Sequence, residues 1–481
     1  MRFQNLGGVA GLSLLLTSMG AIASDTDRLM ELLIDKGILT AEEAEMIRTE
    51  AERDEVPEQP AEERVEKVRL IGAELGYEPT APMRDDGLTG QVPRIGVESA
   101  DGSSRFRMRG RAQLDAAWAD FGDDIPDVAR QGHTFPDYGV ILRRVRLGAL
   151  GIMKEKWEWQ IEVDYAENEV DLANTYMAYL LDHGGRLAVG YFKEPFGMEY
   201  ATSSRYISFI ERSAPADAYK VNREPGIMYE TLQPNWYLGA GLFGHGIDYD
   251  REIREGWAVS LRSSFAPVLT DESFVHLGAG INHRRNAFDR DSDEYESVRL
   301  RAREGTRAID ARLVGRDDIE GVEDFTRTNL EFAAGHQSWW MQGEYYRVDL
   351  DLDPERGDVR VDDTSLTLDG WYLQTGYFLT GERKNYRAFS GDFGLQRPHR
   401  SFSPRNGDWG AFEVAFRYGV ADSLEHSRAG RGQKLERYTA GLNWYLTPET
   451  LMKFNVIYLE GERDIYKDDG WVYGARFQFI F

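Results

Sequence analysis

From Arg105 to its last residue, the chain alternates apolar and polar side chains with a period of two. In the closing segment one face carries Trp471, Tyr473, Ala475, Phe477, Phe479 and Phe481, and the other carries Val472, Gly474, Arg476, Gln478 and Ile480. An earlier segment sets Trp157, Trp159, Ile161, Val163 and Tyr165 against Lys156, Glu158, Gln160, Glu162 and Asp164. Successive side chains of a strand point to opposite faces, so this alternation predicts β-strands with one apolar and one polar face.

Counting the strands predicts a closed architecture. We expect sixteen, near 105–119, 140–153, 156–166, 170–181, 186–193, 223–232, 236–245, 255–266, 274–284, 325–335, 338–349, 364–379, 408–420, 435–447, 450–460 and 469–481. A further candidate at 305–314 would make the number odd, so we assign it to a loop, because an even number brings both ends of a barrel to the same side. The prediction is an all-β fold, a 16-stranded antiparallel transmembrane β-barrel over residues 105–481. Its connections alternate between short turns and longer loops, which include 194–222 and 285–324.

Composition supports a membrane barrel and excludes several other classes. The chain has 11 Trp, 24 Tyr, 23 Phe and 49 Gly, which is typical of strands that meet lipid on one face only. No mature segment has 18 consecutive apolar residues, as a membrane helix would need. The absence of cysteine excludes disulfides and thiol chemistry, and the net charge of −25 argues against nucleic acid as a partner.

The N-terminal part follows different rules. Residues 1–23 have the positive start, apolar run and Ala21-Ile22-Ala23 site of a signal peptide, so we expect the mature protein to leave the cytoplasm. Residues 24–78 are predicted to be helical and periplasmic. Their narrow apolar seam favours a short coiled coil or a docked partner and includes Val65, Val68, Ile71 and Leu75. The alternative is a partly disordered acidic linker, and residues 79–104 are predicted to be a connector.

Two cations stand out in the loop that follows the strand at 186–193. Lys193 and Arg205 are twelve residues apart, and Arg205 follows the hydroxyl residues Thr202, Ser203 and Ser204. The loop is rich in aromatic residues, whose exposure to water would be unfavourable, so we expect it to fold inward against the barrel wall. A guanidinium group suits phosphate because its planar donors form paired hydrogen bonds.

Other arginines gather where the alternation turns them inward. Arg105, Arg107, Arg109 and Arg111 share the polar face of one strand, Arg144 and Arg146 lie on the next, and the long loop holds Arg299, Arg301, Arg303, Arg307 and Arg312. A row of like charges is unfavourable unless anions or carboxylates lie opposite. These arginines either bind anions or pair with the inward acids Glu158, Glu162, Asp164 and Asp115.

Four segments carry a resemblance to a known family. They are FKEPFGMEYATSSRYISFIER, RRVRLGALG, SVRLRARE and GYFLTGE, and together they resemble the phosphate-selective porins of Gram-negative outer membranes. The closing strand, which ends on Phe481, also resembles the sorting signal of bacterial outer-membrane barrels. The resemblance covers roughly residues 105–481.

The resemblance implies a set of pore residues. The lysine of FKEP and the arginine of TSSRY belong to the constriction in that family and match Lys193 and Arg205. The long-loop pair matches Arg299 and Arg301, and the first-strand arginine matches Arg109 or Arg111. The acidic member of the site matches Asp164 or Asp171. The family also folds one long periplasmic turn inward, which matches 380–407 with its Arg383, Lys384 and Arg387.

We therefore expect passive diffusion of small anions, most of all phosphate or polyphosphate, through a basic constriction. The alternatives are a porin of broad or cation-leaning selectivity, and a structural or receptor barrel with a blocked lumen. Outer-membrane lipid and lipopolysaccharide are expected around the barrel, which is expected to form a homotrimer. The sequence has no enzymatic motif, so no enzyme activity, cofactor or metal is expected. Arg437 is expected to lie far from the loop 194–222.

Overall fold

The computed structural model describes residues 68–71, 96–122, 138–246, 253–254, 256–289, 292–300, 302–309, 319–353, 355–356, 364–422, 433–463 and 466–481. The chain divides into the units Met1–Val68 and Arg69–Phe481. The predicted signal peptide and most of the predicted helical segment therefore lie outside the described residues. Within the predicted helical segment 24–78, the described part is β1 (Val68–Ile71), which is a strand, so the helical prediction is wrong there.

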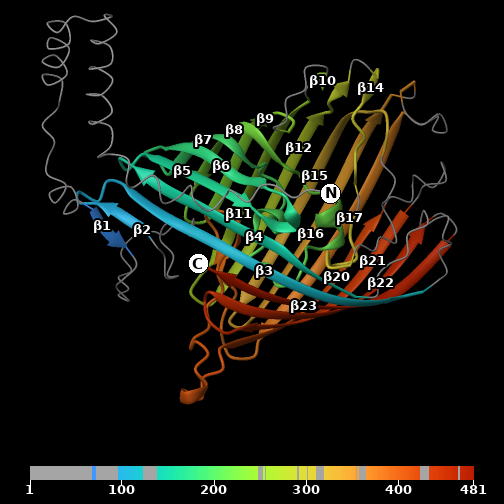
Figure 1. Ribbon diagram of the computed structural model, residues 1–481. Coiled ribbons are helices and arrows are strands. Elements are labelled where there is room, and N and C mark those ends of the chain that lie inside the picture. Colours follow the sequence, from blue (N-terminus) through green and yellow to red (C-terminus); the bar gives the residue numbers. More distant parts are fainter. Residues whose placement is uncertain are drawn as a thin grey trace, which may run out of the picture. The chain divides into compact units, whose positions relative to one another are not determined.

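Sixteen antiparallel strands form the barrel, as predicted. They are β3 (Arg105–Phe121), β4 (Tyr138–Met153), β5 (Trp157–Asp164), β6 (Asp171–Leu180), β7 (Gly185–Lys193), β8 (Arg223–Leu232), β9 (Trp236–Phe243), β11 (Trp257–Leu269), β12 (Ser273–Arg285), β15 (Val322–His336), β16 (Trp339–Leu352), β17 (Ser365–Phe378), β20 (Ala411–Asp422), β21 (Gln433–Tyr445), β22 (Thr450–Arg463) and β23 (Tyr466–Ile480). Each strand pairs with the next, and β23 pairs with β3 from Gly470↔Phe121 to Ile480↔Arg111, which closes the barrel. In Figure 1 the red β23 lies beside the blue β3.

Shorter elements occupy the connections. β2 (Gly96–Ser99) pairs with the start of β3, so the predicted connector 79–104 contains a strand. The long loops hold η1 (Ala166–Asn168), α4 (Met198–Ala201), α5 (Ala214–Ala218), β10 (Ile253–Arg254), β13 (Phe288–Asp289) and β14 (Glu294–Tyr295). The connection from β17 to β20 holds β18 (Tyr386–Arg387), β19 (Asp392–Phe393) and η2 (Pro404–Asn406). No strand occurs among the described residues 302–309, in agreement with the assignment of 305–314 to a loop.

The alternation separates an apolar outside from a polar inside. On β23, Trp471, Tyr473, Phe477 and Phe479 are exposed on the outer face, whereas Arg476 and Gln478 are buried in the interior. An outer row of ring contacts crosses neighbouring strands through Trp371, Tyr418, Tyr438, Tyr458, Trp471, Tyr473 and Trp118. Such an aromatic row is typical of the interface between a membrane and water. No helix among the described residues is long and apolar enough to cross a membrane.

One irregularity changes which side chains face inward. The pairing of β3 with β4 shifts between Gln113 and Leu114, where Gln113 is opposite Arg144 and Leu114 is opposite Leu142. Arg143 is therefore the extra residue of a β-bulge, and both Arg143 and Arg144 are buried. Strict alternation predicts only Arg144 and Arg146 on the inner face.

The last residue completes the barrel seam. Gly110 and Phe481 exchange backbone hydrogen bonds of 2.9 and 3.1 Å. A Cβ atom at Gly110 would lie 2.3 Å from Cζ of the Phe481 ring, so the absence of a side chain at Gly110 allows the ring to cover the strand.

Deleting Phe481 should therefore reduce the amount of folded barrel in the outer membrane, because it removes this seam pair and the end of the outer aromatic row. Heat-modifiable migration in gel electrophoresis measures the folded fraction. Gly110→Ala should cause a smaller loss, since the ring can be displaced while the backbone pair remains. Normal levels of heat-modifiable barrel in the deletion strain would contradict this account.

Candidate functional site

The loop 194–222 crosses the barrel interior. Its hydrogen bonds reach strands on several sides of the lumen: Ser204 Oγ accepts from Arg111 of β3 at 2.8 Å, Ser208 Oγ donates to Glu413 of β20 at 3.2 Å, and the Ile210 N–H donates to Asn455 of β22 at 2.9 Å. Its aromatic residues are buried, among them Phe196, Tyr200 and Phe209. The loop thus packs its apolar side chains inside the barrel instead of exposing them.

A single carboxylate fixes the start of this loop. The two oxygens of Glu344 on β16 accept the N–H groups of Met198 and Glu199, each at 2.7 Å. These are the first N–H groups of α4, which have no partner within the helix. The Tyr372 hydroxyl also bonds to Glu344. The loop therefore enters the lumen in a defined position.

Buried cations hold the far side of the loop by its backbone carbonyls. Each comes from one of the four strands β20 to β23, and each is at most 2% exposed: Arg417, Arg437, Lys453 and Arg476. Arg417 donates to the carbonyl of Glu211 at 3.0 Å, and Arg476 donates to that of Ile210 at 2.6 Å. Lys453 donates to the carbonyls of Ile207 and Phe209, and Arg437 to that of Arg212. We call these four residues the anchor cations.

The position of Arg437 corrects one expectation. This residue was expected to lie far from the loop 194–222, but its guanidinium bonds to the Arg212 carbonyl. Its Nη1 atom donates to the carbonyl of Arg303 at 2.7 Å, so it also holds the second long loop. The contact could not be predicted from the sequence, because Arg437 and Arg212 are far apart in the chain and only the closed barrel brings β21 to the inward loop.

A second group of lumen cations lies on β3, β4, β7, β8 and the loop itself. This basic cluster consists of Arg109, Arg111, Arg146, Lys193, Arg205, Arg212 and Arg223. Lys193 lies within electrostatic reach of Arg111, Arg146, Arg212 and Arg223, and Arg111 lies within reach of Arg109, Arg146 and Arg205. Four of the predicted pore residues, Lys193, Arg205, Arg109 and Arg111, thus lie together.

Two members of the basic cluster, Arg111 and Lys193, form no ion pair with an acid among the described residues. Arg111 is 5% exposed, donates from Nη1 to Ser204 Oγ, and leaves its Nε atom without a hydrogen bond. Lys193 donates to the Tyr200 carbonyl at 2.5 Å and lies 4.5 Å from the centre of the Tyr200 ring. Arg205 donates from Nε to Ser203 Oγ at 3.3 Å. Glu162 lies within electrostatic reach of Arg111 but forms no ion pair with it. A buried cation with little compensating charge is costly, so this arrangement is suited to an anion from solution.

Carboxylates neutralise the remaining wall arginines. Glu162 accepts from Arg109 at 3.1 Å and lies 3.7 Å from Arg146, whereas Asp164 accepts from Arg146 at 2.6 Å. Of the two acids considered from sequence, Asp164 lies in the cluster and Asp171 is exposed. Ion pairs with lumen acids therefore account for Arg109 and Arg146, whereas Glu162 acts on Arg111 only at longer range.

The remaining predicted residues lie elsewhere. Arg299 lines a separate cavity of about 450 Å³, which we call the loop cavity, and Arg301 lies outside the described residues. The loop cavity also contains Lys220, Arg284, Arg303, Arg307 and Arg327, with Asp217 and Glu296 as its acids and His245 at its edge. The structure therefore places Arg299 with other cations but not beside Lys193.

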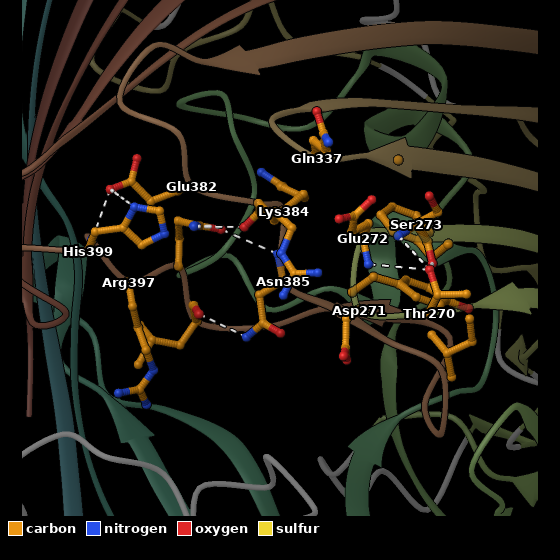
Figure 2. A pocket seen from close by; sticks show the side chains of 17 residues that line it. Thr270, Asp271, Glu272, Ser273, Gln337, Glu382, Lys384, Asn385, Arg397 and His399 are labelled. Carbon is orange, nitrogen blue, oxygen red and sulfur yellow. Dashed lines mark hydrogen bonds and ion pairs between the residues drawn. The ribbon is translucent and has the colours of Figure 1, made fainter.

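The segment 380–407 also enters the barrel at its short-turn end. Arg262 of β11 donates to the carbonyls of Ser390 and Gly391 at 3.0 and 2.6 Å, and the Phe393 N–H reaches Thr202 of the inward loop at 3.3 Å. Figure 2 shows the cavity of about 440 Å³ beside it, with the Glu382–His399 pair on one side and the turn that carries Thr270 and Ser273 on the other. The two inward segments thus touch inside the barrel.

Several contributors were not found from sequence. Arg223 donates to Asn174 at 2.9 Å, Arg212 donates to the Glu199 and Thr202 carbonyls, and the bulge residue Arg143 binds Glu211 at 2.7 Å. The adjacent pair Arg143-Arg144 was the available signal, since two neighbouring arginines in one strand suggest a bulge. Within the described part of the chain, no group of three or more His, Cys, Asp or Glu side chains could hold a metal.

Arg476→Leu should destabilise the barrel by about 3–5 kcal/mol, the usual result of leaving one partner of a buried ion pair alone. Arg476 donates to both oxygens of Asp115 at 2.6 Å, and Asp115 is 1% exposed. The free energy of unfolding, followed by tryptophan fluorescence in urea and detergent, measures this loss.

The matched control is the double variant Arg476→Leu/Asp115→Leu, which also removes the stranded carboxylate and should recover part of the stability. A single variant as stable as the wild type would show that this anchor cation does not hold the structure.

Comparison with known proteins identifies the family of this chain. Residues 106–481 match the family described as phosphate-selective porin O and P. The chain is similar to Porin O of Pseudomonas aeruginosa, with 26% identity over 422 residues that cover 80% of this chain and 90% of that protein. It is also similar to an uncharacterized protein of Caulobacter vibrioides, with 28% identity over 367 residues covering 74% and 68% of the two chains. Among solved structures it is similar to the outer membrane channel DcaP of Acinetobacter baumannii, with 12% identity, a TM-score of 0.48, and coverage of 80% of this chain and 99% of that one. The family match extends over most of the sequence, and the chain therefore belongs to the phosphate-selective porin O and P family and is an outer-membrane porin.

Proposed function

We propose that this porin passes small anions by passive diffusion, most of all phosphate or polyphosphate, and that the basic cluster is the narrow point that selects them. The observation that carries the proposal is the pair Arg111 and Lys193, two buried or half-buried cations that form no ion pair with an acid among the described residues. An anion that enters supplies the missing counter-charge.

The expected binding is shallow. Each hydrogen bond from a charged donor contributes roughly 1.5–3 kcal/mol net, after the loss of water from both groups. Two or three such bonds give a site that discriminates between ions and still releases them, as conduction requires. The planar guanidinium groups of Arg111 and Arg205 match phosphate better than the point charge of Lys193 does.

The charge of the loop cavity also favours anion selectivity. Six of its lining side chains are cationic and two are acidic, although the whole chain carries a net charge of −25. A local excess of positive charge within low-dielectric walls concentrates anions at the entrance. The positions of the cations inside the barrel, not the net charge of the whole chain, would then determine the ion selectivity.

Single-channel recording across a salt gradient tests the proposal. An anion-selective reversal potential with phosphate block of the chloride current is expected. A cation-selective potential would indicate the broad or cation-leaning porin, and the absence of conductance steps would indicate a lumen blocked by the two inward segments.

Arg205→Ala should weaken phosphate block by about tenfold, the equivalent of one charge-assisted hydrogen bond, and shift the reversal potential toward cations. Lys193→Ala should have a smaller effect, because an ammonium group lacks the paired donors. The half-blocking phosphate concentration in planar bilayers is the measurement.

Arg347→Ala is the matched control, since Arg347 is about half exposed and pairs with Asp349 away from the lumen. It should leave block and selectivity unchanged. Equal phosphate block in the wild type and in Arg205→Ala would exclude Arg205 from the site.

The proposal also includes a homotrimer in lipid and lipopolysaccharide, with residues 24–78 on the periplasmic side. Removing residues 25–90 should loosen the trimer and leave the pore conductive, because the barrel strands begin at Arg105. Light scattering in mild detergent measures the assembly. A monomer with those residues present would contradict both the trimer and the role of the segment.

A further inference from the structure

A second binding surface lies directly beside Lys193. It is a cavity of about 230 Å³, which we call the chamber, and its walls come mainly from β6, β7, β8 and the start of the inward loop. Tyr176, Phe192 and Met228 contribute apolar surface, with Ala188 and Ala201 between them. Lys193 belongs both to this lining and to the basic cluster, so the chamber adjoins the basic cluster.

The other charges of the chamber are already neutralised. Arg186 bonds to Glu158 and Glu230, and Arg262 donates to both oxygens of Glu331 at 2.8 Å. The carboxylate of Glu194 accepts from Arg284 at 2.7 Å. Among the lining cations in the described part of the chain, Lys193 is thus the one without a carboxylate partner.

The chamber therefore offers one available cation next to an apolar wall. This differs from the loop cavity, where many cations line the surface. A cavity of roughly 150 Å³ lined by apolar side chains is large enough to bind benzene, so the chamber has room for a group of that size. Sites with apolar walls and a few placed polar groups are typical of organic ligands.

We propose that the chamber binds the apolar body of an organic phosphate whose phosphoryl group lies at Lys193, so that phosphate monoesters with a ring-sized group bind more tightly than inorganic phosphate. The proposal rests on the proposed function, because it requires anions to reach Lys193. The basic cluster alone would not select such phosphate monoesters over inorganic phosphate.

The test compares phenyl phosphate with inorganic phosphate as blockers of chloride current through the full-length protein in planar bilayers. The half-blocking concentration of phenyl phosphate for the wild type should be at least fivefold lower than that of inorganic phosphate. Met228→Gln, which keeps the size of the side chain but makes it polar, should remove most of this preference. Met228→Leu should retain it, because the wall stays apolar.

Ala188→Leu provides an independent variant if Met228→Gln does not fold. The added side chain would fill part of the chamber, since Ala188 is 1% exposed and lies in its lining. It should weaken block by phenyl phosphate at least fivefold and leave block by inorganic phosphate unchanged.

The outcomes separate this inference from the proposed function. If inorganic phosphate blocks the channel and phenyl phosphate blocks it no better, the proposal for the chamber is wrong. The proposal of an anion porin is then unaffected. Preference for phenyl phosphate that survives both Met228→Gln and Ala188→Leu would also overturn it. A cation-selective wild type that neither phosphate blocks would overturn both.

Discussion

A backbone that crosses the inside of a barrel must find hydrogen-bond partners there, and this requirement explains much of the lumen. The strand ladders satisfy their own peptide groups, but the loop 194–222 leaves carbonyls that no ladder can reach. The anchor cations Arg417, Arg437, Lys453 and Arg476 donate to those carbonyls. Charged donors form stronger hydrogen bonds than neutral ones, and truncating a buried ion-pair partner leaves an unpaired charge. The loop is thus held by the same residue types that would otherwise bind solute.

Because of this requirement, the cations of the lumen have different roles. Arg476 satisfies Asp115 and the Ile210 carbonyl together, so its bonding capacity is used within the protein. On the neighbouring strand β3, Arg111 donates to one hydroxyl group and leaves its Nε atom without a hydrogen bond. Lumen cations therefore differ in how many of their hydrogen-bond donors are used within the protein. The distinction comes from where the carbonyls and carboxylates of the inward loop lie.

The sequence predicted the barrel well because the relevant signal is local. Alternation, turn residues and parity depend on neighbouring residues, and all sixteen strands were expected near their observed positions. The family resemblance, carried by short segments, agrees with the family match over 106–481. The inward course of the loop followed from Phe196, Tyr200 and Phe209, which have no favourable place in water. In the N-terminal part a helix was expected where Val68–Ile71 is a strand, since an apolar seam fits more than one structure.

The partners of individual lumen residues were not predictable, because closure brings together positions that are far apart in the chain. Arg437 was expected to be remote and instead bonds to both Arg212 and Arg303. The bulge at Arg143 breaks the alternation that predicted the neighbouring side chains. Arg299 was expected beside Lys193 and lies in the loop cavity. In each case the residue type was visible in the sequence, but its role depends on a single hydrogen bond or register shift.

The central claim is that the inward loop forms one wall of an anion path, and the absence of native cysteine makes a direct measurement available. Ser203 is half-buried in the loop and accepts a hydrogen bond from Arg205. A Ser203→Cys variant can be treated with anionic and cationic methanethiosulfonate reagents of similar size during single-channel recording. The account predicts that the anionic reagent reacts faster, reduces the conductance and lowers anion selectivity. Faster reaction of the cationic reagent, or modification without any change in conductance, would contradict it.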